Sequence, residues 1–413
     1  MEPISRRRFV VGASAVALAP RSSRAQASPL KIGMILPISG NLAQYSADMF
    51  PSFRFVIDKI NDAGGVKSLG GAKIELVVAD NASSSAGTAS EARRLITQEK
   101  VSIIVGSLIT SEVLALVPVL DEYKIPALSL LSGESKSPYL FTIGLNYDKG
   151  YAAPSVDFIS YLVNEKGHNI KSVALAYSNY EGGQQIANWM ETRLLAAGFK
   201  IAGRIPVDRT AQDQTSTILK IKSMKPDAVT GLILTREGIL MHQARANLRY
   251  HDTTFVGCGS GYSDVTLWNQ LGSKFAENVL TRNMFATGVG FCADIDLPAA
   301  KQLISDLQDE IAAKKLLGPI GWFQIWGAQG ARVLQAAIEQ AASSDPEALR
   351  VSIGKVRIEE GSANLYLPRK ELAFGSDNGL IDQTTLAVQW SSDGTQHTVW
   401  PKKFARAEPR AFQ

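Results

Sequence analysis

The sequence predicts an α/β protein built from two doubly wound, Rossmann-like lobes. Short apolar runs alternate with stretches of helical periodicity, which is typical of parallel strands covered on both faces. Two such series follow each other, and the second starts after Gly150. The chain of 413 residues is longer than a single domain usually is, and its 45% hydrophobic content is enough for two hydrophobic cores.

The first series begins with the apolar run LKIGMIL. Each expected strand is a short aliphatic run, and each expected helix repeats its apolar residues three or four positions apart. Gly64 and Gly65 end the first helix, as glycine commonly does. We expect strands at 30–36, 72–80, 101–107 and 125–130, and helices at 47–63, 86–100 and 111–123.

The second series repeats this alternation. We expect strands at 171–178, 200–207, 226–234 and 253–259, and helices at 184–197, 215–224 and 238–248. No Gly/Ser-rich linker separates the two series, so short crossings rather than a flexible tether are expected to join the lobes. Two lobes joined in this way can hinge.

The N-terminus reads as an export signal covering residues 1–27. Its Arg6-Arg7-Arg8-Phe9 order resembles the twin-arginine signal, and the apolar run that follows is too short to cross a bilayer. No cysteine lies near the expected cleavage site, so no lipid anchor is expected. The sequence therefore predicts a soluble protein exported to the periplasm.

The net charge of +4 comes entirely from this signal, whose five arginines face one glutamate. The remaining chain is formally neutral and has no run of Lys or Arg, which argues against nucleic acid or another polyanion as a partner. Cys258 and Cys292 both follow expected strands. They are either a disulfide or two buried small side chains, and the sequence leaves both open.

Three loops of the first series meet at the carboxyl edge of the expected sheet, where ligands of such sheets bind. They are SGNLAQYS, GSLITSE and LLSGES. Hydroxyls of Thr110 and Ser132 beside backbone N–H groups could hold a carboxylate without Lys or Arg. For any single loop, ordinary helix capping by Ser or Thr is the alternative.

Nucleotide, metal and catalytic signals are missing from the sequence. No P-loop ending, dinucleotide-type glycine spacing or Gly-x-Ser-x-Gly elbow occurs, and the four histidines stand apart from possible co-ligands. We therefore expect no cofactor, no metal and no catalytic residue. An exported α/β hydrolase is the alternative from another class, and it would need a nucleophile and a base that the sequence does not offer.

Aromatic residues lie where strands have just ended or helices begin. Tyr45, Tyr180, Tyr262, Trp322 and Phe323 occupy such positions, and Tyr and Trp suit a small organic ligand enclosed from two sides. Among these, Tyr45 and Tyr180 are the stronger candidates for contact with a ligand. Core packing is the alternative for the tryptophans, and it is favoured for Trp326.

Most of the expected mature chain resembles the periplasmic solute-binding proteins of branched-chain amino acid ABC importers, and the resemblance is strongest over residues 31–138. The motifs that carry the resemblance are a strand followed by Ser-Gly, then Gln-Tyr, then Gly-Gly, and the series IELVVADNASSS and VSIIVGSLITSE. This resemblance implies a type I periplasmic binding fold with three crossings between the lobes. The implied lobes are 28–145 with 283–372, and 146–282 with 373–413.

The resemblance also implies the ligand contacts. It puts the carboxylate on Thr110 and on the loop after the fourth strand, an aromatic wall at one side, and closing residues from the second lobe. Arg236 and Ser260 are added to the positions that the resemblance implies. The expected ligand-binding set is Tyr45, Thr110, Leu131, Ser132, Gly133, Tyr180, Arg236, Ser260 and Phe323.

One departure from the family pattern concerns the ligand's ammonium group. Amino-acid binders of this family carry a Glu after the strand near Phe255, whereas this chain reads GCGSGY there. Either Glu237 or Asp264 replaces it, or the ligand has no ammonium, because a buried ammonium without a counter-charge costs several kcal/mol. Arg236 favours an acidic or neutral polar ligand.

Together these features predict a monomeric binding protein that captures a branched-chain-type amino acid or related small carboxylate by hinge closure. Its partner would be the membrane permease of an ABC importer. An amine-free aromatic carboxylate or amide is the alternative ligand within the same fold. A sensor domain is disfavoured because no signalling segment is appended.

Overall fold

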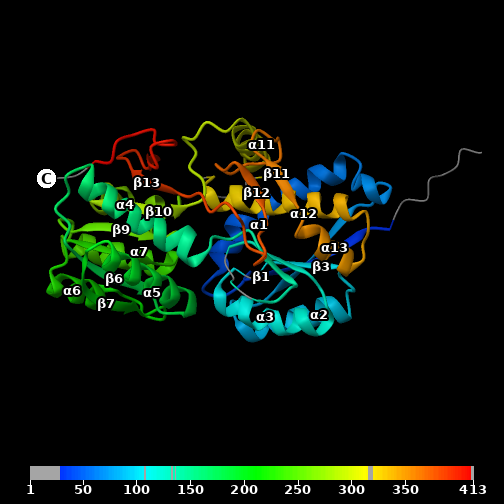
Figure 1. Ribbon diagram of the computed structural model, residues 1–413, viewed down its shortest axis with the longest axis horizontal. Coiled ribbons are helices and arrows are strands. Elements are labelled where there is room, and N and C mark those ends of the chain that lie inside the picture. Colours follow the sequence, from blue (N-terminus) through cyan, green and yellow to red (C-terminus); the bar gives the residue numbers. More distant parts are fainter. Residues whose placement is uncertain (1–27, 107, 132–133, 135, 315–319, 411–413) are drawn as a thin grey trace, which may run out of the picture.

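The computed structural model describes residues 28–106, 108–131, 134, 136–314 and 320–410. It has two α/β lobes placed side by side along the long axis (Figure 1). The expected export signal, residues 1–27, lies outside the described residues, as do Ser132 and Gly133. Among the described residues, no helix is long and apolar enough to cross a membrane.

The first lobe contains a five-stranded parallel sheet of order β2-β1-β3-β4-β5. Both faces are buried: Ile32 and Met34 of β1 belong to one core cluster, whereas Ile35 belongs to the other. This explains the near-continuous apolar runs in the sequence. The strands are β1 Leu30–Leu36, β2 Ile74–Asp80, β3 Ile103–Gly106, β4 Ala127–Ser129 and β5 Leu140–Thr142.

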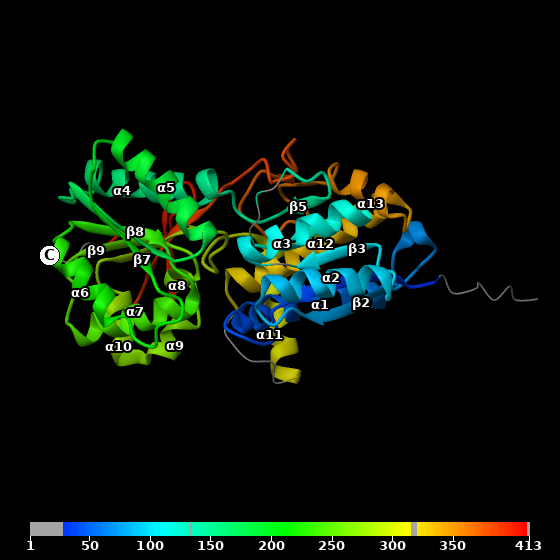
Figure 2. The same cartoon turned by 90° about the horizontal axis from the view of Figure 1, so that it is seen from below.

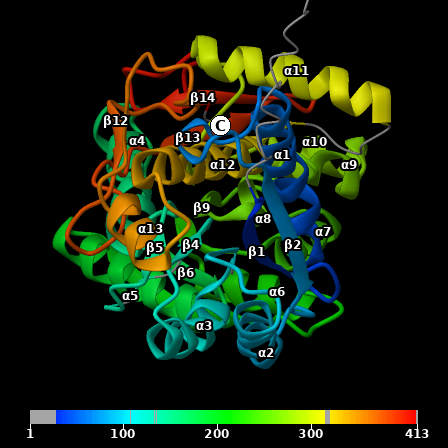
Figure 3. The same ribbon diagram turned by 90° about the vertical axis from the view of Figure 1, so that its right-hand side faces the viewer.

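Helices cover both faces of this sheet, with α1 and α12 on one side and α2 and α3 on the other, and α11 lies outside α12 (Figure 3). The helices are α1 Ala43–Asp62, α2 Ser85–Thr97, α3 Thr110–Tyr123, α11 Pro298–Lys314, α12 Trp322–Ala341 and α13 Pro346–Ile353, with the short 3₁₀ turn η1 Lys67–Leu69. A two-stranded antiparallel sheet, β11 Arg357–Glu359 with β12 Glu371–Ala373, completes the lobe.

The helices α1 and α12 approach each other closely at Gly327. A Cβ atom at this position would lie 2.3 Å from the Met49 carbonyl oxygen and 2.8 Å from Ser52 Oγ. Only glycine leaves room for the α1 backbone there. The first turn of α12, which belongs to the site described below, is therefore fixed by a backbone-to-backbone contact.

The second lobe contains a seven-stranded sheet of order β14-β13-β10-β9-β8-β6-β7. The strands from β7 to β10 run parallel, and β13 and β14 are antiparallel additions. They are β6 Ser172–Ser178, β7 Lys200–Val207, β8 Ala228–Leu232, β9 Thr254–Cys258, β10 Met284–Val289, β13 Leu386–Trp390 and β14 Gln396–Trp400.

The helices of this lobe lie around the sheet (Figure 2). They are α4 Ala153–Asn164, α5 Glu181–Ala196, α6 Thr215–Met224, α7 Thr235–Asn247, α8 Ser260–Ser263, α9 Leu267–Leu271 and α10 Ser273–Leu280, preceded by the π-helical turn η2 Tyr147–Ala152. Helix α6 has the expected bounds, whereas α1, α5 and α7 begin three or four residues earlier than expected.

The expected lobe boundary at residue 283 needs correction. It assigns β10 to the first lobe, but β10 pairs with β9 on one side and with β13 on the other, so it lies inside the seven-stranded sheet. The chain returns to the first lobe only after Val289. Three segments thus run between the sheets, after β5, after β10 and after β12, and the first and last of these fall near the expected positions.

The two cysteines are free, which rules out the disulfide alternative. Cys258 is buried in β9, and the Cys292 thiol donates to the carbonyl of Gln396 at 3.4 Å. Burial raises the pKa of both thiols, so they stay protonated at neutral pH. They act as small buried side chains.

Candidate ligand-binding site

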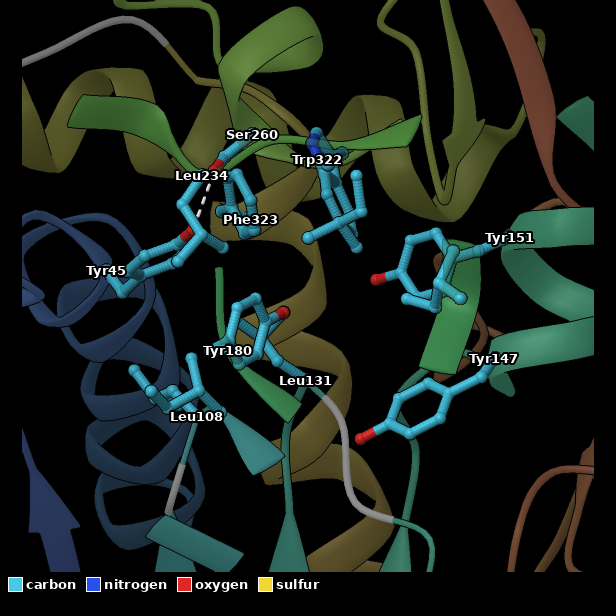
Figure 4. A pocket seen from close by; sticks show the side chains of 14 residues that line it. Tyr45, Leu108, Leu131, Tyr147, Tyr151, Tyr180, Leu234, Ser260, Trp322 and Phe323 are labelled. Atoms are coloured by element: carbon cyan, nitrogen blue, oxygen red, sulfur yellow. Dashed lines mark hydrogen bonds between the residues drawn. The ribbon is translucent and has the colours of Figure 1, made fainter. Parts of the chain in front are cut away.

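A cavity lies between the lobes, where loops from the carboxyl ends of both sheets face each other (Figure 4). We call it the inner pocket. Aromatic and aliphatic side chains form its walls, and both lobes contribute to them. The lining residues are Tyr45, Leu108, Ile109, Leu131, Tyr147, Tyr151, Tyr180, Ile186, Leu232, Leu234, Gly259, Ser260, Trp322 and Phe323.

Hydroxyl groups are the main polar side-chain atoms of the inner pocket. None of the described lining residues carries a charged side chain. Burial raises the pKa of Tyr45, Tyr151 and Tyr180 well above that of a free phenol, so these hydroxyls are neutral donors and acceptors at physiological pH. The pocket can therefore enclose an apolar body and hydrogen-bond to polar atoms at its edge.

Two lining residues of the pocket form a hydrogen bond between the lobes. Tyr45 on α1 and Ser260 on α8 place their hydroxyl oxygens 2.6 Å apart (Figure 4). The Tyr45 ring also meets Phe323 edge-on, with ring centroids 5.5 Å apart. Because Tyr45 and Ser260 belong to different lobes, this bond can exist only when the lobes are together.

The first turn of α12 forms the roof of the pocket. Trp322 and Phe323 pack ring against ring with centroids 4.0 Å apart. The Trp322 indole N–H donates to Ser263 Oγ at 3.1 Å, which ties this first-lobe helix to the second lobe. Trp326, one turn further, is fully buried and does not line the pocket, as its core assignment predicted.

The inner pocket is nearly filled by its own side chains. Its volume of about 30 Å³ is room for about two water molecules, whereas sites for organic ligands usually measure roughly 300–1,000 Å³. The lobes described are therefore closed on each other at this point. A ligand of more than a few heavy atoms enters only if lining side chains or the lobes themselves move apart.

The expected carboxylate-binding residues have different positions. Thr110 begins α3 and is buried; it is not among the lining residues, but its hydroxyl shares a hydrogen bond with the hydroxyl of Tyr147, which is one of them. Leu131 lines the pocket. Ser132 and Gly133 lie outside the described residues. Five expected residues thus surround one cavity: Tyr45, Leu131, Tyr180, Ser260 and Phe323.

Arg236 does not line the inner pocket, in contrast to its expected position. Its guanidinium donates to the Arg209 carbonyl at 2.9 Å and to Gln212 Oε1 at 3.1 Å, and these two bonds turn it away. It lines a neighbouring cavity of about 210 Å³, which also touches Tyr45. We call this second space the outer cavity.

The two carboxylates considered as ammonium partners are both engaged elsewhere. Glu237 Oε1 lies 3.3 Å from Arg209 Nε and lines only the outer cavity. Asp264 accepts hydrogen bonds from the Thr266 backbone and hydroxyl at 2.9 and 2.7 Å. Neither side chain lines the inner pocket, so neither faces a ligand there.

Tyr147 and Tyr151 line the pocket but were not among the expected residues. Both lie on η2, directly after the first crossing. Their spacing of four residues puts them on one side of a helical turn, and that spacing was the available signal. Tyr262, one of the aromatic residues that the sequence offered for ligand contact, is instead buried in the second lobe. Its ring lies edge-on to the His242 ring, with ring centroids 5.5 Å apart.

Two doubly wound lobes, three crossings and an enclosed interlobe cavity are the architecture of type I periplasmic binding proteins. The chain belongs to the Periplasmic binding protein family, whose sequence profile matches residues 29–395. The sequence resemblance predicted this family.

Individual relatives are distant. The chain is 25% identical to "Leu/Ile/Val-binding protein homolog 8" of Brucella melitensis, with 98% of both chains covered. It resembles the Streptococcus pneumoniae branched-chain amino acid binding protein in complex with isoleucine at a TM-score of 0.73 and 20% identity, covering 90% of this chain and 100% of that one. A Rhodopseudomonas palustris solute-binding protein in complex with 3,4-dihydroxybenzoic acid gives a TM-score of 0.74 and 20% identity, covering 90% and 95%.

Within the residues described, no group of three or more His, Cys, Asp or Glu side chains could hold a metal ion. The four histidines remain scattered, and His242 is fully buried with its ring nitrogens bonded to the Gly261 carbonyl and to Arg245. Burial lowers the pKa of His242 to about 3, so it is a neutral core residue.

Proposed function

We propose that the protein captures a small carboxylate in the periplasm and passes it to the membrane permease of an ABC importer. The inner pocket carries this proposal, because it is enclosed by both lobes and combines aromatic walls with neutral hydroxyls. We further propose that the exported chain acts as a monomer, releases its N-terminal signal and performs no chemical step on the ligand.

An amine-free aromatic acid is the ligand class that we favour. The described lining residues offer rings for stacking and hydroxyls for hydrogen bonds, but no carboxylate to pair with an ammonium. Burying an unpaired ammonium would cost several kcal/mol. The 3,4-dihydroxybenzoic acid bound to the structurally similar Rhodopseudomonas protein supports this choice.

A branched-chain amino acid is the second candidate. The Brucella relatives are named as Leu/Ile/Val-binding homologues, and the similar Streptococcus protein holds isoleucine. Leu108, Ile109, Ile186 and Leu232 offer an aliphatic surface that suits such a side chain. The amino group would then need a carboxylate that moves into the pocket, and the buried Asp264 and Glu237 are the two candidates.

Capture would proceed by closure of the lobes. We propose that the ligand carboxylate takes the Thr110 hydroxyl, now bonded to Tyr147, and the N–H groups of the loop at 131–133. Tyr147, Tyr151 and Tyr180 then close over the ligand from the second lobe. A ligand shifts the protein to the closed form only through the extra contacts that it makes there.

Thermal unfolding and calorimetry with a ligand panel test this proposal. Benzoate, 4-hydroxybenzoate and 3,4-dihydroxybenzoate should raise Tm, since a ligand at a hundredfold excess over Kd stabilises by roughly 2.7 kcal/mol. Leucine, isoleucine and valine serve as the matched aliphatic set. Stabilisation by the amino acids alone would select the second candidate, and stabilisation by none of the six would contradict both.

Turnover of any stabilising compound is the check on the enzymatic alternative. The compound should be recovered unchanged after long incubation with a stoichiometric amount of protein, as judged by chromatography. Appearance of a product would support the alternative that the protein is an exported α/β hydrolase.

A further inference from the structure

The outer cavity adjoins the inner pocket and lies between the same two lobes. Tyr45 and Leu234 line both spaces, so they form the wall between them. In contrast to the inner pocket, the outer cavity is lined by charged side chains. These are Arg209, Arg236 and Glu237, which together leave one positive charge in excess.

Arg209 is the residue on which the inference rests. It follows β7, and its side chain is 20% exposed. Its Nε is buried and forms an ion pair with Glu237 Oε1 at 3.3 Å. A guanidinium has five N–H donors, and one carboxylate partner does not engage all of them, so Arg209 keeps donors for a ligand in the cavity.

The surrounding residues hold Arg209 in place. Arg236 donates to the Arg209 carbonyl at 2.9 Å and is itself held by Gln212, so Arg236 is a positioning residue. The Arg209 guanidinium also lies 5.4 Å from the centroid of the Tyr180 ring, which lines the inner pocket. Arg209 is therefore fixed at the border between the two spaces.

We propose that the ligand carries a second acidic group, which extends past Tyr45 into the outer cavity and binds the Arg209 guanidinium. This inference rests on the proposed function and narrows its ligand class to acids with a polar anionic group at each end of an apolar body. The neutral pocket holds the inner end of the ligand, and the outer end meets the Arg209 donors that the ion pair with Glu237 does not engage.

A pair of matched probes tests the proposal by calorimetry on the full exported chain. Benzoate has one acid group, and terephthalate carries a second one at the opposite end of the same ring; 4-(2-carboxyethyl)benzoate extends that second group further. Wild-type protein should bind at least one of the two diacids tenfold or more tightly than benzoate. Arg209→Gln should weaken that diacid roughly tenfold to hundredfold, the usual effect of losing a charged hydrogen bond, and should change benzoate affinity less than threefold.

Arg204 provides the matched control. It lies on the same strand region, pairs with Glu191 and lies 5.3 Å from the ring centroid of Tyr177, but it does not line either space. Arg204→Gln should leave the affinities of both ligand types unchanged. Arg209→Lys should recover part of the diacid affinity, since it restores charge without the two-pronged geometry.

Equal loss of benzoate and diacid binding in Arg209→Gln would overturn the proposal, because Arg209 would then act on the fold or on the inner site. Benzoate binding without any preference for a diacid would also overturn it while leaving the proposed function intact. If the wild-type chain binds none of these acids, the aromatic-acid ligand class fails, and the outer subsite fails with it.

Discussion

At the scale of single residues, Tyr45 has three structural roles. Its ring packs against Phe323, its hydroxyl bonds Ser260 in the other lobe, and its side chain separates the inner pocket from the outer cavity. The sequence singled out Tyr45 because it follows a strand end at the expected ligand-binding edge. Its bond to Ser260 could not be predicted, since the two residues are 215 positions apart.

Removal of the Tyr45 hydroxyl should weaken ligand binding. Tyr45→Phe keeps the ring but loses a bond that exists only in the closed form, so affinity should fall by about 0.5–1.5 kcal/mol. Ser260→Ala should have a similar effect, and calorimetry of the double variant should show less than the sum of the two. Full additivity would mean that the bond does not contribute to closure.

Arg236 shows where residue-level prediction reached its limit. Its place at the start of α7 was predicted near the ligand, but its direction is set by Arg209 and Gln212, which are 27 and 24 positions away. The local sequence is enough to predict that a residue such as Arg236 follows a strand. The direction of a long side chain depends on partners that only the folded chain brings near.

At the scale of elements, the alternation of strands and helices was predictable because the central strands, such as β3, β8 and β9, are buried along their whole length and read as continuous apolar runs. The assignment of β10 to the first lobe was wrong. Its apolar run fits either sheet equally well, and only its pairing with β9 and β13 decides between them. Several elements outside the two expected series were not predicted. The strands β5, β13 and β14 and the helices α8–α10 are short and have weak periodicity, but the long helices α4, α11 and α12 were missed as well.

The contact between α1 and α12 makes Gly327 sensitive to substitution. In Gly327→Ala the new methyl group would meet the Met49 carbonyl at 2.3 Å, so the two helices must separate. We expect a loss of about 1–3 kcal/mol in the free energy of unfolding, measured by urea denaturation.

Gly354→Ala is the control for this effect. Gly354 has an ordinary φ of −63°, and its nearest neighbour would be Phe141 Cε1 at 3.4 Å. This variant should be close to wild type. If both alanine variants unfold at the same urea concentration, the helix contact is not as tight as described.

At the scale of the whole molecule, the interface between the lobes buries two carboxylates against each other. Asp48 lies on α1 and accepts from Gln44 at 2.9 Å, and Gln324 approaches it at 3.4 Å. Asp264 of the second lobe is held by Thr235 and Thr266. Burial and repulsion from Asp264 raise the pKa of Asp48 to about 7, and burial raises the pKa of Asp264.

This pair should make the stability of the closed protein depend on pH. Asp48 binds a proton more tightly when folded than when unfolded, where its pKa is 3.8, so its contribution is complete at low pH and is lost between about pH 4 and pH 7. The free energy of unfolding should therefore fall by up to about 1.4 kcal/mol per pH unit in that window from this group.

Asp48→Asn, which imitates the protonated form, should flatten this dependence in urea titrations from pH 4.5 to 7.5. Asp58→Asn on the same helix is the control, because the Asp58 side chain is 54% exposed and lies outside the interface. The control should keep the wild-type slope; if Asp48→Asn keeps it as well, the titrating group is another residue.

Neither lobe is formed by one continuous stretch of the chain. The seven-stranded sheet takes its last two strands, β13 and β14, from near the C-terminus, and β13 covers the edge of β10. A fragment ending before residue 386 would leave that hydrogen-bonding edge bare and open to pairing with other chains. Cutting the gene once in its middle therefore cannot yield two independently soluble halves, and an isolated lobe for biophysical work would have to be assembled from separate stretches spliced by an artificial loop.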